Sequence, residues 1–185
     1  MNDEKLFLTL KEIDKKLKGI NWILISGLAV KLYAYPERKS DDIDILIPNE
    51  EDFVKASKIF NKEIRDRFLE KGTFYSKDKG FETVVNGVNV EVTRGLWHMK
   101  FKEFEATPKI DEEWLKHVQK REFHGIKLKL QPLEEVIIIK VFMGREKDEK
   151  DLEKLLKLNI DKNFLERNAK NWNCYGKLLE FLKKY

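Results

Sequence analysis

The chain has 185 residues, enough to bury a core, and its 42% hydrophobic residues are typical of a globular protein, while its 38% charged residues are a high share. Its formal net charge of +4 is compatible with a nucleic-acid partner but too small to indicate one. A single cysteine, Cys174, excludes an internal disulfide and suits the cytoplasm, where we expect the protein to act. No apolar run approaches the roughly 20 residues that a membrane helix needs.

The first part of the chain predicts alternating helices and strands, because apolar spacing changes repeatedly between helical and strand periods. Glycine and asparagine supply the end signals. In chain order we expect a helix over 4–18, a strand over 20–25, a helix opened by Ser26-Gly27, a strand over 42–47, and a helix over 50–61 capped by Asn49.

A β-hairpin is the clearest local signal in the middle of the chain. Asn86-Gly87 separates the β-rich runs 81–85 and 88–93, and this dipeptide is the strongest short-range hairpin signal. Valines alternate along the second run, which places Glu91 on the opposite, polar face. The preceding residues, 66–79, are mixed and predict no single element.

The second half predicts more helix than strand. We expect an irregular segment over 94–110, a helix over 111–120, a strand over 124–130, a helix from Pro132 to Gly144, and charged helices from Lys147, the last over 175–184. The charge run 146–157 is interpreted as a solvated helix face with Glu146 and Lys150 paired. The three histidines and four tryptophans are interpreted as structural. Strands mixed with helices indicate an α/β or α+β fold.

Three carboxylates stand out on the expected strands. Asp42 and Asp44 share one strand face, where they repel each other unless a cation lies between them. Glu91 is a third carboxylate on a strand with an apolar opposite face. Oxygen ligands of this kind suit a hard divalent cation. Ser26-Gly27 ahead of a helix suits a phosphate, since the helix N-terminus attracts anions and glycine permits close approach.

These motifs resemble the DNA polymerase β-type nucleotidyltransferase superfamily. The resemblance is carried by Ser26-Gly27, the run Arg38-Lys39-Ser40-Asp41-Asp42-Ile43-Asp44, and Val90-Glu91-Val92. The second run is similar to the small prokaryotic branch, which includes minimal nucleotidyltransferases and abortive-infection type toxins. The segment 130–156 is similar to the part that follows their catalytic core. In all, the resemblance covers roughly residues 20–158.

The resemblance implies a nucleotidyltransferase fold, with a small mixed β-sheet flanked by helices and a C-terminal helical portion. It implies one domain over 1–185, with a catalytic core over about 20–130 and the helical portion over about 131–185. The implied reaction moves a nucleoside monophosphate from an NTP to a hydroxyl and releases pyrophosphate.

Roles for particular residues follow from the same resemblance. Asp42, Asp44 and Glu91 are expected to be catalytic and to bind two Mg²⁺ ions. Nucleotide binding is expected at a second set of residues, Ser26, Gly27, Ser40 and Lys140. Two features depart from the usual pattern: the turn is Ser-Gly where Gly-Gly or Gly-Ser is common, and the third acid is Glu where Asp is common.

The sequence leaves the acceptor and the biological role open. The acceptor is a tRNA 3′ end, a protein hydroxyl or a small molecule, and a cognate toxin or antitoxin protein is a candidate partner. The alternative hypothesis is a non-catalytic nucleotide-binding or antitoxin-like protein with a degenerate nucleotidyltransferase fold. Lys140, alone in an apolar helix, either contacts triphosphate or lies on an exposed stripe.

Overall fold

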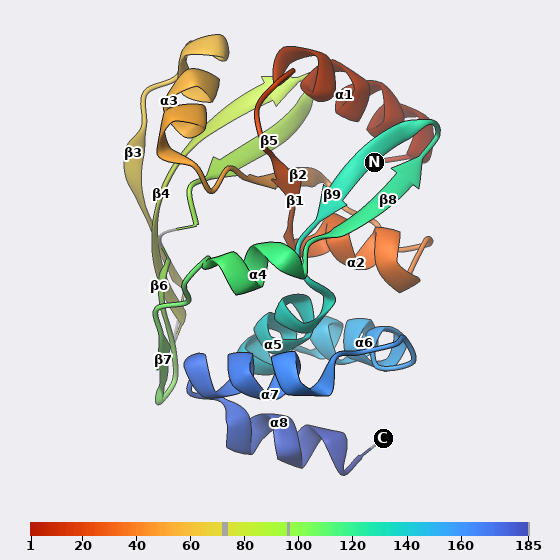
Figure 1. The fold of residues 1–185 in the computed structure, drawn as a ribbon, viewed down its shortest axis with the longest axis vertical. Coiled ribbons are helices and arrows are strands. Elements are labelled where there is room, and N and C mark those ends of the chain that lie inside the picture. The colour runs from red at the N-terminus through yellow and green to blue at the C-terminus, as the bar shows by residue number, and fades with distance from the viewer. Residues whose placement is uncertain (72–73, 96, 185) are drawn as a thin grey trace.

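A curved sheet of nine strands organises the computed structural model, which describes residues 1–71, 74–95 and 97–184 (Figure 1). The strand order is β7-β6-β4-β5-β2-β1-β9-β8, and β3 pairs with β4 beside this path. The strands are β1 (Ile23–Leu24), β2 (Asp42–Leu46), β3 (Arg65–Lys71), β4 (Phe74–Val85), β5 (Val88–Thr93), β6 (His98–Phe101), β7 (Phe104–Ala106), β8 (Gln119–Phe123) and β9 (Ile126–Leu130).

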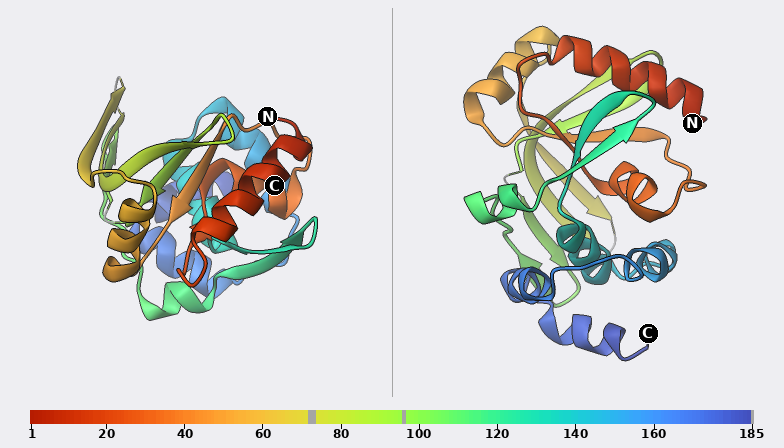
Figure 2. Two further views of the ribbon diagram at one scale, coloured as in Figure 1. Left: turned by 90° about the horizontal axis from the view of Figure 1, so that it is seen from above. Right: turned by 45° about the vertical axis from the view of Figure 1, so that its right-hand side comes forward.

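Helices cover the sheet from two ends. Helices α1 and α3 lie at one end, and α5 to α8 gather at the other, with α2 between them (Figures 1 and 2). Their bounds are α1 (Asp3–Lys16), α2 (Ser26–Ala34), α3 (Glu50–Ile59), α4 (Glu112–Lys116), α5 (Leu133–Met143), α6 (Glu146–Leu155), α7 (Lys162–Asn171) and α8 (Tyr175–Leu182). In the described part of the chain, no helix has the length and apolar character needed to cross a membrane.

The centre of the sheet is the pair β2 and β5, which run parallel to each other. On β2, Ile43 and Ile45 are fully buried, and the aspartates between and before them face the other way. Strand β1 pairs antiparallel with β2 and parallel with β9. The chain therefore reaches the start of α2 directly beside the polar face of β2.

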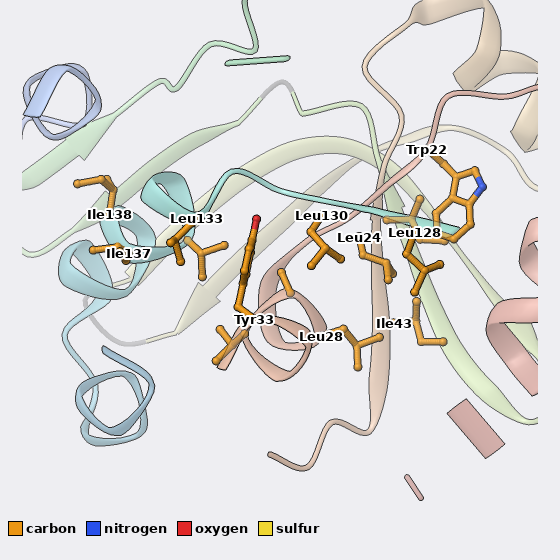
Figure 3. Packing of buried hydrophobic residues seen from close by; sticks show 14 of the residues in the cluster. Trp22, Leu24, Leu28, Tyr33, Ile43, Leu128, Leu130, Leu133, Ile137 and Ile138 are labelled. Carbon is orange, nitrogen blue, oxygen red and sulfur yellow. The ribbon is translucent and has the colours of Figure 1, made fainter. Parts of the chain in front are cut away.

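The core beneath this centre joins α2, β2, β9 and α5. Leu24, Leu28, Ile43 and Leu130 lie together in it, and Ile137 extends the same cluster into α5 (Figure 3). Tyr33 at the end of α2 donates its hydroxyl to the backbone carbonyl of Gln131 at 2.7 Å. Because α2 is fixed on the core in this way, its first residues have a defined place next to the acidic strand.

Several local predictions are confirmed. Helix α1 covers most of 4–18, and the side chain of Asn49 caps α3 by accepting from the N–H of Asp52. The hairpin turns at Asn86-Gly87, as expected. Helix α5 follows Pro132 and ends at Gly144, which adopts a left-handed conformation with φ of 57°.

Four segments differ from expectation. Residues 66–79 contribute to β3 and to the first half of β4, while 94–110 contains the hairpin of β6 and β7. The helix expected over 111–120 stops at Lys116, and the chain continues as β8. The strand expected over 20–25 is reduced to Ile23–Leu24. Residues 72, 73 and 96 lie outside the described part.

Two of the strands that were not predicted, β6 and β8, share a physical reason. Strand β8 is exposed along most of its length, and β6 has no fully buried residue, so neither shows a clear apolar alternation. Their strand conformation depends on pairing with a neighbour: β8 with β9, and β6 with β4 and β7. A pattern that depends on burial cannot detect such strands.

Candidate active site

Three carboxylates meet where β2 and β5 lie side by side. The parallel register sets Asp44 opposite Glu91 and Asp42 opposite Asn89. One carboxylate oxygen from each of Asp42, Asp44 and Glu91 lies within 4.8 Å of the others. The expected grouping of three acids is therefore present in the fold. It results from the pairing of β2 with β5, which sets Asp44 opposite Glu91, 47 positions later in the chain.

The three carboxylates hold more negative charge than their surroundings compensate. Burial raises the pKa of Asp44 to about 7, and the neighbouring charges of Asp42 and Glu91 add to this effect. Burial also raises the pKa of Glu91, against the opposing charge of Arg67. Such a set of crowded oxygen ligands fits a hard divalent cation such as Mg²⁺, which would relieve the repulsion.

The Ser26-Gly27 turn lies beside these acids. Ser26 opens α2 in a left-handed conformation with φ of 58°, and its N–H donates to Oε1 of Gln131 at 3.2 Å. A Cβ at Gly27 would come within 2.5 Å of Arg38 Nη1 and 3.3 Å of Ser40 Oγ. Glycine lets the arginine and the serine pack directly on the turn, and a larger residue would displace the end of the Arg38 side chain.

Ser40 supports one of the acids. Its hydroxyl oxygen lies 3.2 Å from Oδ1 of Asp42 and 3.1 Å from the backbone carbonyl of the same residue. Ser40 is buried, so this contact restrains the carboxylate of Asp42. The residue expected to contact nucleotide is thus placed where it orients Asp42 and lines the adjoining groove.

A groove of about 500 Å³ leads away from Asp42 and Asp44 past the Ser26-Gly27 turn. We call it the basic groove, because cationic side chains form much of its wall. These cations are Arg38, Lys39, Lys140, Arg145 and Lys147. Two other sequence-predicted residues, Ser26 and Gly27, lie at the end nearest the acids, so the structure brings all seven predicted site residues to one region.

Lys140 lies on the wall of this groove and is almost completely buried, so it does not belong to an exposed stripe. Its ammonium is 2.9 Å from Oδ1 of Asp148 and 2.9 Å from Oδ2 of Asp151. The ammonium donates a hydrogen bond to Asp148 and forms an ion pair with Asp151. Arg38 and Arg145 bind the same pair, at 3.0 Å to Asp151 and 2.6 Å to Asp148.

The interpretation of 146–157 as a solvated face is wrong for its inner side. Asp148 and Asp151 on α6 are buried, and they hold the cations of the basic groove in place. The outer side is solvated as expected, with Glu146 and Lys150 forming an exposed ion pair at 3.4 Å.

Electrostatics indicate that this wall suits an anion. The positive charge of Arg145, followed by partial burial, lowers the pKa of Lys147, and Lys140 and Arg38 act in the same direction. Cations that repel one another across a groove are stabilised when an anion lies between them.

Two residues of the site were missed from the sequence. Arg67 on β3 donates to Oε2 of Glu91 at 3.2 Å and forms two hydrogen bonds with Asp78. Gln131 fixes the Ser26 N–H, as described above. Arg67 had no usable signal, because β3 was not predicted. Gln131 had a weak one: it is a polar residue between the end of a strand and the proline that starts a helix.

The fold, with three carboxylates at its centre, is that of the nucleotidyltransferases. The chain belongs to the family described as nucleotidyl transferase of unknown function (DUF2204), whose model matches residues 4–172. This confirms the resemblance noted from the motifs. No curated protein matches the chain.

Solved structures share the fold. TM1012 from Thermotoga maritima, a candidate nucleotidyltransferase, is 24% identical with a TM-score of 0.59, covering 85% of this chain and 96% of its own. An antigenic nucleotidyltransferase-like protein from Paracoccidioides brasiliensis is 15% identical with a TM-score of 0.55, covering 98% and 88%. The lincosamide antibiotic adenylyltransferase LnuA, bound to lincomycin, is 13% identical with a TM-score of 0.51, covering 86% and 99%. The predicted mixed-sheet fold is therefore confirmed.

Proposed function

We propose that the protein is a Mg²⁺-dependent nucleotidyltransferase that moves a nucleoside monophosphate from an NTP to a hydroxyl acceptor and releases pyrophosphate. The observation that carries this proposal is the convergence of three carboxylates within 4.8 Å at the end of a groove walled by cations. The protein acts as one domain in the cytoplasm, with the core over about 20–130 and the helical portion over about 131–185 enclosing the groove.

The side chains have distinct roles in this proposal. Asp42, Asp44 and Glu91 would hold two Mg²⁺ ions, and ions at this site would supply charge neutralisation for the phosphates and a lower pKa for the acceptor hydroxyl. Ser26 and the N–H groups at the start of α2 bind phosphate oxygens. Lys140, Arg145 and Lys147 bind the triphosphate along the basic groove, in positions fixed by buried carboxylates.

Glu91 is the proposed general base. It accepts the proton of the acceptor hydroxyl, whose oxygen forms a bond to the α-phosphorus while the bond to the pyrophosphate oxygen breaks. Arg67 holds Oε2 of Glu91 at 3.2 Å, which fixes the orientation of the carboxylate. This restraint offsets the extra methylene that distinguishes Glu from the commoner Asp.

The experiment is transfer of label from an α-labelled NTP in the presence of Mg²⁺. Asp42→Asn and Asp44→Asn are expected to abolish transfer and leave the melting temperature close to that of the wild type. Asp41→Asn is the matched control, because the Asp41 side chain is 99% exposed and adjacent in sequence. Transfer retained in both test variants would falsify the assignment.

The same assay separates the alternative of a non-catalytic binder. A wild-type protein that melts at a higher temperature with NTP and Mg²⁺, yet labels no acceptor, favours the degenerate nucleotidyltransferase. A role beside a cognate toxin or antitoxin is tested by co-purification with the product of the neighbouring gene. Labelling of that product by the wild type, and not by Asp44→Asn, would make it the acceptor.

A further inference from the structure

A second cavity adjoins the three carboxylates. It has a volume of about 160 Å³ and shares Ser26, Asp44, Met99, Gln131 and Ile139 with the basic groove. Asp42 lines the groove, Glu91 lines the second cavity, and Asp44 lines both. The carboxylates therefore stand at the junction of two spaces, one for each reactant of a transfer reaction. We call the second space the aromatic cavity.

The walls of the aromatic cavity are largely apolar. They include Ile25 after β1, Met99 on β6 and Ile139 on α5, together with the rings of Trp97 and Trp172. Both tryptophans are buried, which confirms their interpretation as packing residues. They also give the cavity a surface on which a flat or apolar ligand can lie.

The aromatic cavity has fewer cationic side chains in its walls than the basic groove. Apart from the active-site acids, its charged lining consists of Arg67 and Asp78, which neutralise each other through two hydrogen bonds. Arg67 also pairs with Glu91. Within the described residues, the cavity thus presents no cation without an acidic partner. A phosphodiester backbone is bound by several lysines and arginines, whereas the described lining of this cavity contains one cation, Arg67, so nucleic acid does not suit it.

The remaining polar groups suit hydroxyl and carbonyl groups. Ser76 and Thr93 line the cavity. The Thr93 hydroxyl is already engaged, because it donates to the backbone carbonyl of Lys79 and accepts from the N–H of Gly95. Gln131 is 1% exposed, and its Nε2 atom is buried with no hydrogen-bond partner among the described residues. A buried donor in that state is rare and marks a place where a ligand or water completes the site. Gln131 lies where the cavity meets the groove, next to the reacting groups.

Resting on the proposed function, we infer that the aromatic cavity binds the acceptor, and that this acceptor is an uncharged small molecule with a hydroxyl on a flat or apolar body. The volume corresponds to about five water molecules at roughly 30 Å³ each, the size of a small ring compound or one end of a larger one. The hydroxyl oxygen bonds to the α-phosphorus, its proton passes to Glu91, and pyrophosphate leaves through the basic groove.

The test fills the aromatic cavity without touching the groove. Ser76 lies on the cavity face of β4, paired with Met99 of β6, so Ser76→Leu projects into the cavity. Its neighbour Lys77 points to the opposite face and lines a different surface, so Lys77→Leu is the matched control. Both variants and the wild type receive an α-labelled NTP, Mg²⁺ and, separately, the small-molecule, RNA and protein fractions of a cell extract.

We expect label in the small-molecule fraction with the wild type and Lys77→Leu, and a loss of about 10²-fold with Ser76→Leu, because misplacing a reactant by about 1 Å can cost that much. The rise in melting temperature caused by NTP and Mg²⁺ is expected to be equal in all three proteins, which shows that the groove is intact. If Ser76→Leu does not fold, the smaller Ser76→Val takes its place.

The opposite results separate this inference from the proposed function. Label found only in the RNA or protein fraction, and lost in Asp44→Asn, overturns the acceptor class while transferase activity stands. Equal labelling of the small-molecule fraction by Ser76→Leu overturns the assignment of the cavity. No label in any fraction removes the proposed function together with the inference.

Discussion

Two groups of close carboxylates in this protein differ in the charges beside them. Asp148 and Asp151 face Lys140, with Arg38 and Arg145 on either side. Burial alone would raise the pKa of Asp148, but hydrogen bonds from Arg145 and Lys140 outweigh it and hold the pKa below its usual range. In the other group, the acids of β2 and β5 are paired with Arg67 through Glu91, and the pKa of Asp44 rises to about 7.

The difference distinguishes a group of carboxylates with a structural role from one that forms a functional site. A buried carboxylate that is matched by cations stabilises the fold and fixes those cations in place, as α6 does for the basic groove. Crowded carboxylates without enough partners destabilise the fold unless a ligand compensates them, which is typical of functional sites. The composition of the two groups is similar, so their neighbours and not their residue type decide which role each has.

The largest expected effect is on the compensated group. Asp148→Ala leaves Lys140 buried with half of its partners and should lower the free energy of unfolding by about 3–5 kcal/mol. Glu146→Ala, on the exposed side of the same helix, should change it by less than about 1 kcal/mol. Urea denaturation of both variants measures this. Equal losses would mean that the inner and outer faces of α6 do not differ.

Glu135 is a third case, a buried carboxyl whose hydrogen-bond donor, Trp172, carries no charge. Burial raises the pKa of Glu135 to about 7 from its usual 4.5, although Trp172 Nε1 donates to it at 2.9 Å. The folded protein then binds more protons than the unfolded chain between these values, so stability falls as the pH rises through this window and levels off above it.

Glu135→Gln keeps an acceptor for the tryptophan and removes this dependence. We expect it to raise the free energy of unfolding by up to about 3 kcal/mol above the folded-state pKa and to change it little near pH 4.5. Denaturation curves across the window, compared with the wild type, measure the slope. A variant that is less stable than the wild type at alkaline pH contradicts the raised pKa.

Asp44→Asn tests the uncompensated group directly. In metal-free buffer, it should be at least as stable as the wild type, because it removes one of three mutually repelling charges. Mg²⁺ at roughly 100 times its Kd should stabilise the wild type by about 2–3 kcal/mol and leave the variant unchanged. Thermal melts with and without Mg²⁺ measure both effects. A Mg²⁺ response equal to that of the wild type would remove Asp44 from the metal site.

The smallest effect on stability is expected at the turn. In Gly27→Ala, the new Cβ displaces the end of the Arg38 side chain, while alanine favours the helix. The two effects oppose each other, so the free energy of unfolding should change by less than about 1 kcal/mol. NTP affinity should fall, because Arg38 no longer lies against the turn. Calorimetric titration measures this, and unchanged affinity would place Arg38 outside the nucleotide site.

Local signals in the sequence were enough for much of the fold. The capping Asn49, the Asn86-Gly87 turn and the Pro132–Gly144 limits of α5 each act within a few residues, so they could be interpreted without the rest of the chain. The edge strands could not be predicted in this way. Strands β3 and β8 consist mostly of charged and polar residues with no apolar alternation, and their strand conformation depends on pairing with β4 and β9.

The sequence by itself determined which chemical groups this protein has: two aspartates on one strand face, a glutamate on another, and a serine-glycine turn ahead of a helix. The spacing of apolar residues and the residue types at turns are short-range properties, so they can be identified from the sequence alone. Only the tertiary structure decided which charges meet. The same Asp and Lys residues form a solvated helix or a buried support, depending on whether α5 packs against α6. Likewise, the distance between Asp44 and Glu91 depends on a strand register that no local pattern encodes.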